Sequence, residues 1–182
     1  LANNTGKTPI AVIFSNTTST TDQSHGWTRG YAMALKDAST SSAWDTKGGT
    51  VIPNPTGSYI TTSAEMIADK DGYTKTTKII NSINNPSVYF SAAYAAATGY
   101  KSTVAAPSNT SGWYLPSVGQ WYEILVNLGK MSATGYTGSY YLSWSSGAST
   151  CANNVNAYLT PLTSGTYDTF LWTSSTSYGY WS

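Results

Sequence analysis

The clearest pattern in the chain is an apolar stripe at helical spacing that follows a sharp corner. Pro116 fixes its own φ and ends an extended segment, because proline is not tolerated inside a helix. Ser117 and Gln120 have the S-x-x-Q spacing of a capping box, which predicts a helix that starts here and ends near Gly129. One apolar face of this helix is formed by Trp121, Ile124, Leu125 and Leu128.

Two patterns near the N-terminus predict strands. Residues 10–14 are a continuous apolar run of strand length, and the Ser/Thr/Asn-rich residues 15–24 after it predict a loop. Between residues 27 and 35, large side chains alternate with smaller ones, which is the two-residue period of a strand. Good helix formers in the same stretch also permit a helix. We predict a strand.

The remaining patterns predict further helices within one domain. A helix is expected from about Gly72 to Asn84, an Ala- and Tyr-rich helical or coiled stretch over 89–97, and a short helix over 153–159. Paired glycines and two prolines predict a loop over 45–60. No internal repeat or linker divides the chain, so we predict a single α+β domain over residues 1–182.

Composition agrees with a folded domain and argues against two classes of partner. The 182 residues are 40% hydrophobic, enough to fill one core, and the 14% aromatic content is unlike that of a disordered chain. Only 9% of residues are charged and the net charge is +1, so we expect no nucleic-acid partner. No run approaches the roughly 20 apolar residues of a membrane helix, so we expect no membrane insertion.

The cysteine count and the surface chemistry favour an exported protein without disulfides. Cys151 is the single cysteine, so no intrachain disulfide can form. The chain starts at Leu1 with neither a basic nor an apolar leader region, and we expect a processed mature protein or an excised domain. The many Ser, Thr, Tyr and Asn residues and the few Lys residues are more typical of exported than of cytosolic proteins.

Candidate catalytic groups are few. His25 and Cys151 are the only residues of their kinds, so a Cys–His dyad requires the fold to bring a His-Gly turn beside a loop that enters a helix. We expect Cys151 to be a small buried hydrophobe instead. A glycosidase would need two of the eight carboxylates to face each other across a cleft. We therefore predict no catalytic residues and a protein that is not an enzyme.

One short motif resembles part of a metal-binding loop. Asp69 and Asp71, followed by Gly72, resemble the start of a calcium loop, but Ile80 stands where an EF-hand needs its glutamate. We interpret the two aspartates as acidic residues that favour the N-terminus of the following helix. The prediction is no metal site and no cofactor.

Two motifs resemble the bacterial branch of the C-type-lectin-like fold, a group loosely related to formylglycine-generating enzymes. Residues 112–121 read GWYLPS followed by Gln-Trp, and residues 171–175 read LWTSS. Members of this group carry a G-W-x-L-P-[ST] corner before their second helix and an aromatic-Trp-[ST]-Ser-[ST] strand after it. The resemblance implies a small mixed or antiparallel sheet with two main helices. The structural motif then comprises Trp113, Leu115, Pro116, Ser117, Trp121 and Trp172.

The end of the chain departs from that pattern. In this group, further strands follow the Trp-Thr-Ser-Ser strand and complete the sheet, whereas here the sequence stops at Trp181-Ser182. We expect the closing strands to be absent or to come from a second fragment or a partner chain, because an open sheet edge promotes aggregation. The oxidase chemistry of the formylglycine-generating relatives depends on two cysteines, which Cys151 alone cannot supply.

The last third of the chain carries the candidate binding residues. Tyr, Ser, Gly and Asn together are typical of antibody binding loops, and aromatic faces also stack on sugar rings. The tryptophans at 113, 121 and 172 are expected in the core. The candidate ligand-binding residues are Tyr140, Trp144, Tyr178, Tyr180 and Trp181.

These observations predict a recognition domain. The expected function is calcium-independent binding of a glycan or a protein by an exported bacterial surface protein, such as an adhesin or the tip of a pilus-like fibre. Some proteins of this fold are targets of diversity-generating retroelements, which vary the C-terminal ligand-facing region. A structural module packed within a larger surface protein, and an enzyme of unrecognised type, are the alternatives.

Overall fold

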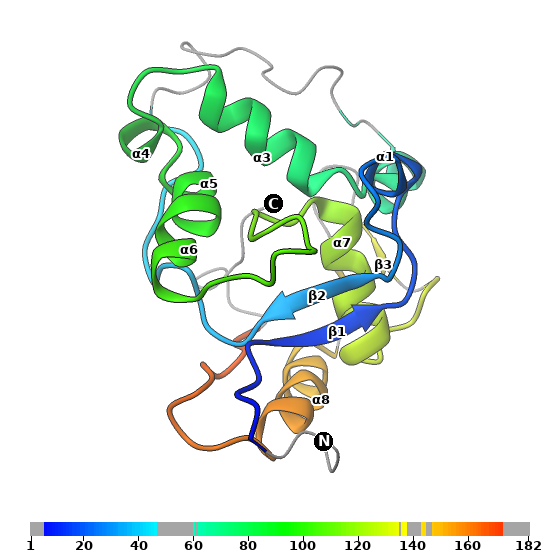
Figure 1. The fold of residues 1–182 in the computed structure, drawn as a ribbon. Coiled ribbons are helices and arrows are strands. Elements are labelled where there is room, and N and C mark those ends of the chain that lie inside the picture. Colours follow the sequence, from blue (N-terminus) through cyan, green and yellow to red (C-terminus); the bar gives the residue numbers. More distant parts are fainter. Residues whose placement is uncertain are drawn as a thin grey trace.

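The computed structural model describes residues 6–46, 60, 62–134, 136–137, 143–144 and 147–172, the two residue pairs by their backbone alone. These residues form short helices and small antiparallel sheets, an α+β architecture (Figure 1). The predicted loop over 45–60 lies almost entirely outside the described residues.

The N-terminal sheet is an antiparallel hairpin of β1 (Ala11–Ser15) and β2 (Tyr31–Ala34). Both predicted strands are confirmed, but β2 starts later than residue 27. Gly30, with φ 122°, precedes β2, and a Cβ there would lie 2.1 Å from the carbonyl oxygen of Ser15. Only glycine can make this close approach. The register pairs Ala11 with Ala34, Val12 with Met33 and Ile13 with Ala32.

A helix stands between the two strands, so the prediction of a loop throughout residues 15–24 is wrong. This helix is α1 (Thr20–Ser24), and it follows Ser19, whose Oγ accepts a hydrogen bond from the backbone N–H of Asp22 at 3.1 Å. Serine in this position satisfies one of the unpaired donors at a helix N-terminus. The Ser-x-x-Asp spacing was therefore a readable signal for α1.

The middle of the chain is helical. The prediction from Gly72 is confirmed by α3, although the helix ends at Asn81 rather than Asn84. Asn85 then takes a left-handed conformation, φ 62°, before the chain turns helical again, which confirms the helical interpretation of residues 89–97. The helices of this region are α2 (Ser63–Ala68), α3 (Gly72–Asn81), α4 (Pro86–Tyr89), α5 (Ser91–Tyr94), the π-helical turn η1 (Ala95–Gly99) and α6 (Tyr100–Thr103).

The Leu-Pro-Ser corner leads into a helix, as predicted. This helix consists of α7 (Val118–Glu123) and the π-helical turn η2 (Ile124–Leu128). Gln120 Oε1 accepts the backbone N–H of Ser117 at 3.0 Å, which is the glutamine arm of the predicted capping box. Gly119 lets α7 approach the end of α2, since a Cβ there would lie 2.3 Å from the carbonyl oxygen of Asp69.

The last third of the described chain begins with a second antiparallel pair, β3 (Tyr136–Thr137) and β4 (Ser143–Trp144). It continues with α8 (Ala148–Leu159), which begins before the predicted residue 153. With 12 residues, α8 is a long helix in addition to the two main helices that the resemblance implied. Cys151 therefore lies within a helix and not in a loop. Among the described residues, no helix is long and apolar enough to cross a membrane.

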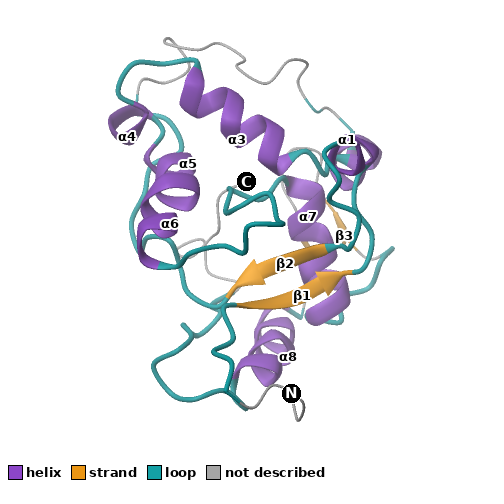
Figure 2. Cartoon of the chain, viewed as in Figure 1, coloured by secondary structure: helices purple, strands orange, loops and turns teal. Residues whose placement is uncertain are grey.

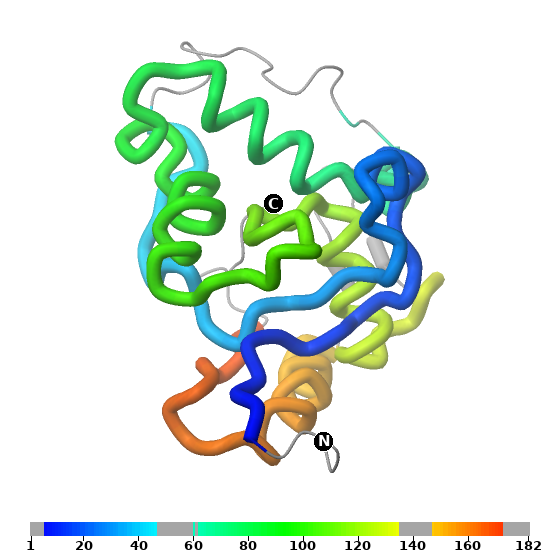
Figure 3. Tube along the Cα trace, viewed as in Figure 1, coloured from blue at the N-terminus to red at the C-terminus, as the bar shows by residue number. Residues whose placement is uncertain are grey.

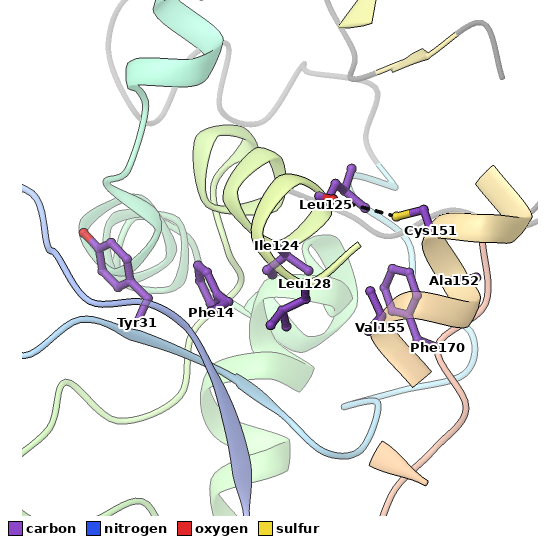
Figure 4. Packing of buried hydrophobic residues seen from close by; sticks show 9 residues of the cluster. All are labelled: Phe14, Tyr31, Ile124, Leu125, Leu128, Cys151, Ala152, Val155 and Phe170. Carbon is purple, nitrogen blue, oxygen red and sulfur yellow. Dashed lines mark hydrogen bonds between the residues drawn. The ribbon is translucent and has the colours of Figure 1, made fainter. Parts of the chain in front are cut away.

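The main core lies where η2 packs between β1 and α8 (Figures 2 and 4). Cys151 is fully buried there and its Sγ points to the carbonyl oxygen of Leu125 at 3.9 Å, which confirms its predicted place in the core. A second, smaller cluster joins α3 to α5 through Ile79, Phe90 and Ala93. The main core consists of Phe14, Tyr31, Ile124, Leu125, Leu128, Cys151, Ala152, Val155 and Phe170.

Candidate functional site

A cavity of about 560 Å³ lies between the β1–β2 hairpin, helices α5 to α6, the Leu-Pro-Ser corner and the end of the described chain. Its volume falls within the range of about 300–1,000 Å³ that is usual for ligand pockets. The segment between α6 and α7 runs on the same side of the hairpin as α5 and α6 (Figure 3). The aromatic lining comprises Phe14, Tyr31, Tyr100, Trp113, Tyr114, Trp121 and Phe170.

The corner forms one wall of the cavity and is anchored at two points. The indole N–H of Trp113 donates to the carbonyl oxygen of Val104 at 2.7 Å, and its ring meets Tyr100 edge-on at a centroid distance of 5.1 Å. The Thr76 hydroxyl of α3 donates to the backbone oxygen of Leu115 and accepts from its backbone N–H, both at 3.1 Å. These contacts hold the corner in place against α3 and α6.

A buried hydrogen-bond network supports the cavity floor. The Tyr31 hydroxyl donates to Asp22 Oδ2 at 2.7 Å and accepts the backbone N–H of Ser19 at 2.8 Å. Burial raises the pKa of Tyr31 to about 12. Asp22 is only 2% exposed, and its Oδ1 has no hydrogen-bond partner within the described part of the chain. Tyr31 is therefore a neutral donor that shields a buried carboxylate.

A second tyrosine of the lining is also held in its neutral form. Gln120 Nε2 donates to the Tyr114 hydroxyl at 2.9 Å. Burial, reinforced by the negative charge of Asp22, raises the pKa of Tyr114 well above its usual range. Both phenols of the lining are therefore uncharged near neutral pH, and the proton of Tyr31 is already donated to Asp22.

Two carboxylates lie together at the end of β2. The backbone N–H of Asp37 donates to Asp168 Oδ2 at 2.9 Å, and the N–H of Asp168 donates to the carbonyl oxygen of Leu35 at 2.8 Å. Burial and the negative charge of Asp168 raise the pKa of the Asp37 carboxyl. Sequence reasoning missed this pair because 131 positions separate the two residues and no spacing rule joins them. With Lys36, they are the charged residues that line the cavity in the described structure.

An aromatic cluster continues from the cavity wall to the surface. Tyr114 meets Tyr73 edge-on at 6.1 Å, Tyr73 meets Trp27 at 4.7 Å, and the exposed imidazole of His25 stacks on Trp27 at 4.8 Å. The sole histidine thus belongs to this cluster, whereas Cys151 belongs to the core beside η2. The described structure does not assemble a Cys–His dyad.

The calcium-like motif is engaged in packing. The carboxylate of Asp69 pairs with Lys75 of α3 at 2.6 Å, and its backbone oxygen accepts from Ser117 Oγ at 2.6 Å. Asp71 precedes α3 as its N-terminal cap residue. Across the residues that the structure describes, no group of three or more His, Cys, Asp or Glu side chains is placed to hold a metal ion.

The predicted binding residues lie largely beyond what the structure describes. Tyr140, Tyr178, Tyr180 and Trp181 fall outside the described residues, and Trp144 is placed in β4 by its backbone only. Their role remains a prediction.

All residues of the predicted structural motif lie in the part of the chain that the structure describes. Trp113, Leu115 and Pro116 line the cavity, and Ser117 holds the start of α7. Trp121 and Trp172 pack against the main core while partly buried. Trp113 is likewise only partly buried, at the cavity wall, so the expectation that it lies in the core is wrong.

No protein-family model, curated protein or solved structure matches this chain.

Proposed function

We propose that this chain is a non-enzymatic ligand-recognition domain of an exported bacterial surface protein, an adhesin or the tip of a surface fibre. The observation that carries the proposal is the aromatic-lined cavity of about 560 Å³ beside the Leu-Pro-Ser corner. We assign it a C-type-lectin-like fold, which is supported by the corner ahead of α7 and by the antiparallel N-terminal hairpin. The C-terminal aromatic residues would extend the binding face.

The lining favours an uncharged or cationic ligand. Aromatic faces offer large contact areas to sugar rings or peptide side chains. Among the described residues that line the cavity, the carboxylates of Asp37 and Asp168 outnumber the one cation, Lys36. Calcium is not needed in this proposal, since Lys75 already pairs with the carboxylate of Asp69. Millimolar calcium or EDTA should therefore change neither the melting temperature nor ligand binding.

Binding to a combined glycan and surface-protein panel tests the proposal, in calcium and in EDTA. Ala32 is exposed and lines the cavity, so Ala32→Trp should fill the cavity and abolish any hit without loss of folding. Ala157, an exposed residue of α8 away from the cavity lining, gives the matched control Ala157→Trp, which should bind normally. A hit that survives Ala32→Trp would place binding elsewhere, and a blank panel from folded protein would favour a structural module.

The carboxylate pair favours a second candidate function, hydrolysis of a glycosidic bond. Such a reaction needs one protonated and one ionised carboxyl group near the scissile bond. Asp37 and Asp168 lie at the cavity, and the pKa of Asp37 is raised. Release of nitrophenol from a panel of nitrophenyl glycosides, lost in both Asp37→Asn and Asp168→Asn, would support the hydrolase. Binding without any turnover would support the recognition domain.

A further inference from the structure

We propose that the cavity receives an extended segment of a partner protein, which adds as a strand to the open edge of β2 and places a lysine or arginine side chain beside Asp37 and Asp168. This inference rests on the proposed recognition function and names its ligand class, a cationic peptide segment rather than a glycan.

The first support is the orientation of the β2 backbone. In an antiparallel pair, successive residues direct their N–H and C=O groups alternately to the two edges. Leu35 donates its N–H to Ile10 next to β1 at 3.2 Å, and Met33 is in the same phase opposite Val12. The backbone groups of Ala32 and Ala34 therefore face the other edge.

That other edge borders the cavity. Every residue from Tyr31 to Lys36 lines it, and no hydrogen bond to the backbone groups of Ala32 or Ala34 is found among the residues described. The backbone of Lys36, the next residue in the same phase, is hydrogen-bonded to the Tyr100 side chain, so the open part of the edge consists of Ala32 and Ala34. Unpaired N–H and C=O groups in a row are a template for another strand. Peptides that bind in this way obtain affinity from main-chain hydrogen bonds and specificity from side-chain pockets.

The second support is the space beside this edge. A paired strand lies about 4.8 Å from its neighbour, so the facing wall must leave room for a backbone. Residues with only a methyl side chain occupy both sides of the cavity: Ala32 and Ala34 on β2, and Ala95 and Ala96 on η1. Small residues on both walls suit a polypeptide backbone better than a bulky rigid ring.

The third support is charge. Asp37 and Asp168 stand where β2 ends, with the Asp37 N–H 2.9 Å from an Asp168 carboxylate oxygen. Of the charged residues that line the cavity in the described chain, these two outnumber the single cation, Lys36. A positive side chain of the incoming strand would relieve the repulsion between the two carboxylates and form charge-assisted hydrogen bonds to them.

Peptide selection on the full chain tests the proposal. A displayed library of random seven-residue peptides should yield binders with alternating β-formers and one Lys or Arg. The selected peptides are then synthesised with N-methyl groups on either the odd or the even residues. Methylation removes N–H donors from one edge of a strand, so one set should weaken binding about tenfold and the other little. The protein is unchanged, so folding does not confound the comparison.

A second comparison tests the proposed contact between the peptide's Lys or Arg and the two carboxylates. Replacing the peptide's Lys or Arg by norleucine should weaken binding to the wild-type chain at least about fivefold. The same replacement should weaken binding less with Asp168→Asn, which retains only the Asp37 carboxylate and whose amide oxygen can still accept the Asp37 N–H. Equal losses with both proteins would contradict the assigned contact.

Three results would overturn the proposal. They are a failure to select any peptide, equal effects of the two methylation patterns, and binding confined to a synthetic peptide of residues 173–182, TSSTSYGYWS. The last result would assign the β2 edge to the chain's own C-terminal segment. Glycan binding that Ala32→Trp abolishes, without any peptide binding, would remove this inference and leave the proposed recognition function intact.

Discussion

Removing one hydroxyl group, in the substitution Tyr31→Phe, should destabilise the protein by about 3 kcal/mol. Phenylalanine keeps the shape of the ring, so the core around Phe14 is not disturbed. What is lost is the 2.7 Å hydrogen bond to Asp22 Oδ2 and the 2.8 Å bond from the Ser19 N–H. A hydrogen bond to a charged group contributes about 1.5–3 kcal/mol, and an unsatisfied buried donor costs about 1–3 kcal/mol.

The cost falls on a carboxylate that cannot turn to solvent. Asp22 is 2% exposed and already has one oxygen without a partner among the described residues, so its second oxygen would be stranded as well. For a chain of 182 residues, about 3 kcal/mol corresponds to a drop in melting temperature of about 6–12 °C.

Urea unfolding at neutral pH measures this effect. Tyr158→Phe is the matched control, because Tyr158 is 41% exposed on α8 and the loss of its hydroxyl should cost less than about 0.5 kcal/mol. In the double variant with Asp22→Asn, the stranded group is a neutral amide, so the two changes should couple by about 1 kcal/mol or more. A Tyr31→Phe variant within about 0.5 kcal/mol of the wild type would refute the buried network.

Three further measurements test other parts of the structure. Gly119→Ala should destabilise the protein by about 1–3 kcal/mol, because the added Cβ would lie 2.3 Å from the carbonyl oxygen of Asp69. Gly99→Ala, whose Cβ would lie 4.0 Å from its nearest neighbour, should instead stabilise the protein by about 0.5–1 kcal/mol. Equal urea midpoints for the two variants would contradict this packing. The Cys151 thiol, fully buried and with its pKa raised by burial to about 11, should react with a thiol reagent near pH 8 only after unfolding, and prompt reaction of the native protein would place it at the surface. Finally, the free energy of unfolding should fall as the pH rises from about 10 to about 12. The reason is that Tyr31 releases its proton near pH 10 in the unfolded chain but retains it to about pH 12 in the folded protein. The Tyr31→Phe variant should lack the part of this pH dependence that Tyr31 causes.

Local sequence signals predicted the positions of several helices and strands. The S-x-x-Q spacing of Ser117 and Gln120 located the start of α7, and the apolar run over residues 10–14 located β1. These predictions succeeded because capping and strand formation depend on residues close together in the chain. The helix α1 carried a similar signal in Ser19 and Asp22, which the Ser/Thr-rich composition of the stretch obscured.

Local sequence signals did not predict the candidate site. Asp37 meets Asp168 only because the chain after α8 passes the end of β2, where Leu35 accepts the Asp168 N–H. Trp113 was expected in the core, but the packing of the whole chain leaves it partly buried at the wall of the cavity. Tertiary contacts of this kind follow from how the whole chain packs, which a period or a motif does not encode.

The alanines that line the cavity bear on how this protein could evolve. A single base change converts an alanine codon to one for valine, threonine or aspartate, each of which narrows or recharges a methyl-lined wall. Ala32 and Ala95 stand at the cavity, outside the buried core, so such changes can alter what fits there while the packing of η2 against β1 and α8 stays the same. At these two positions a substitution carries less risk of unfolding than at the buried wall residues Ala92 and Ala96, so under the proposed recognition function they are where single changes would alter specificity.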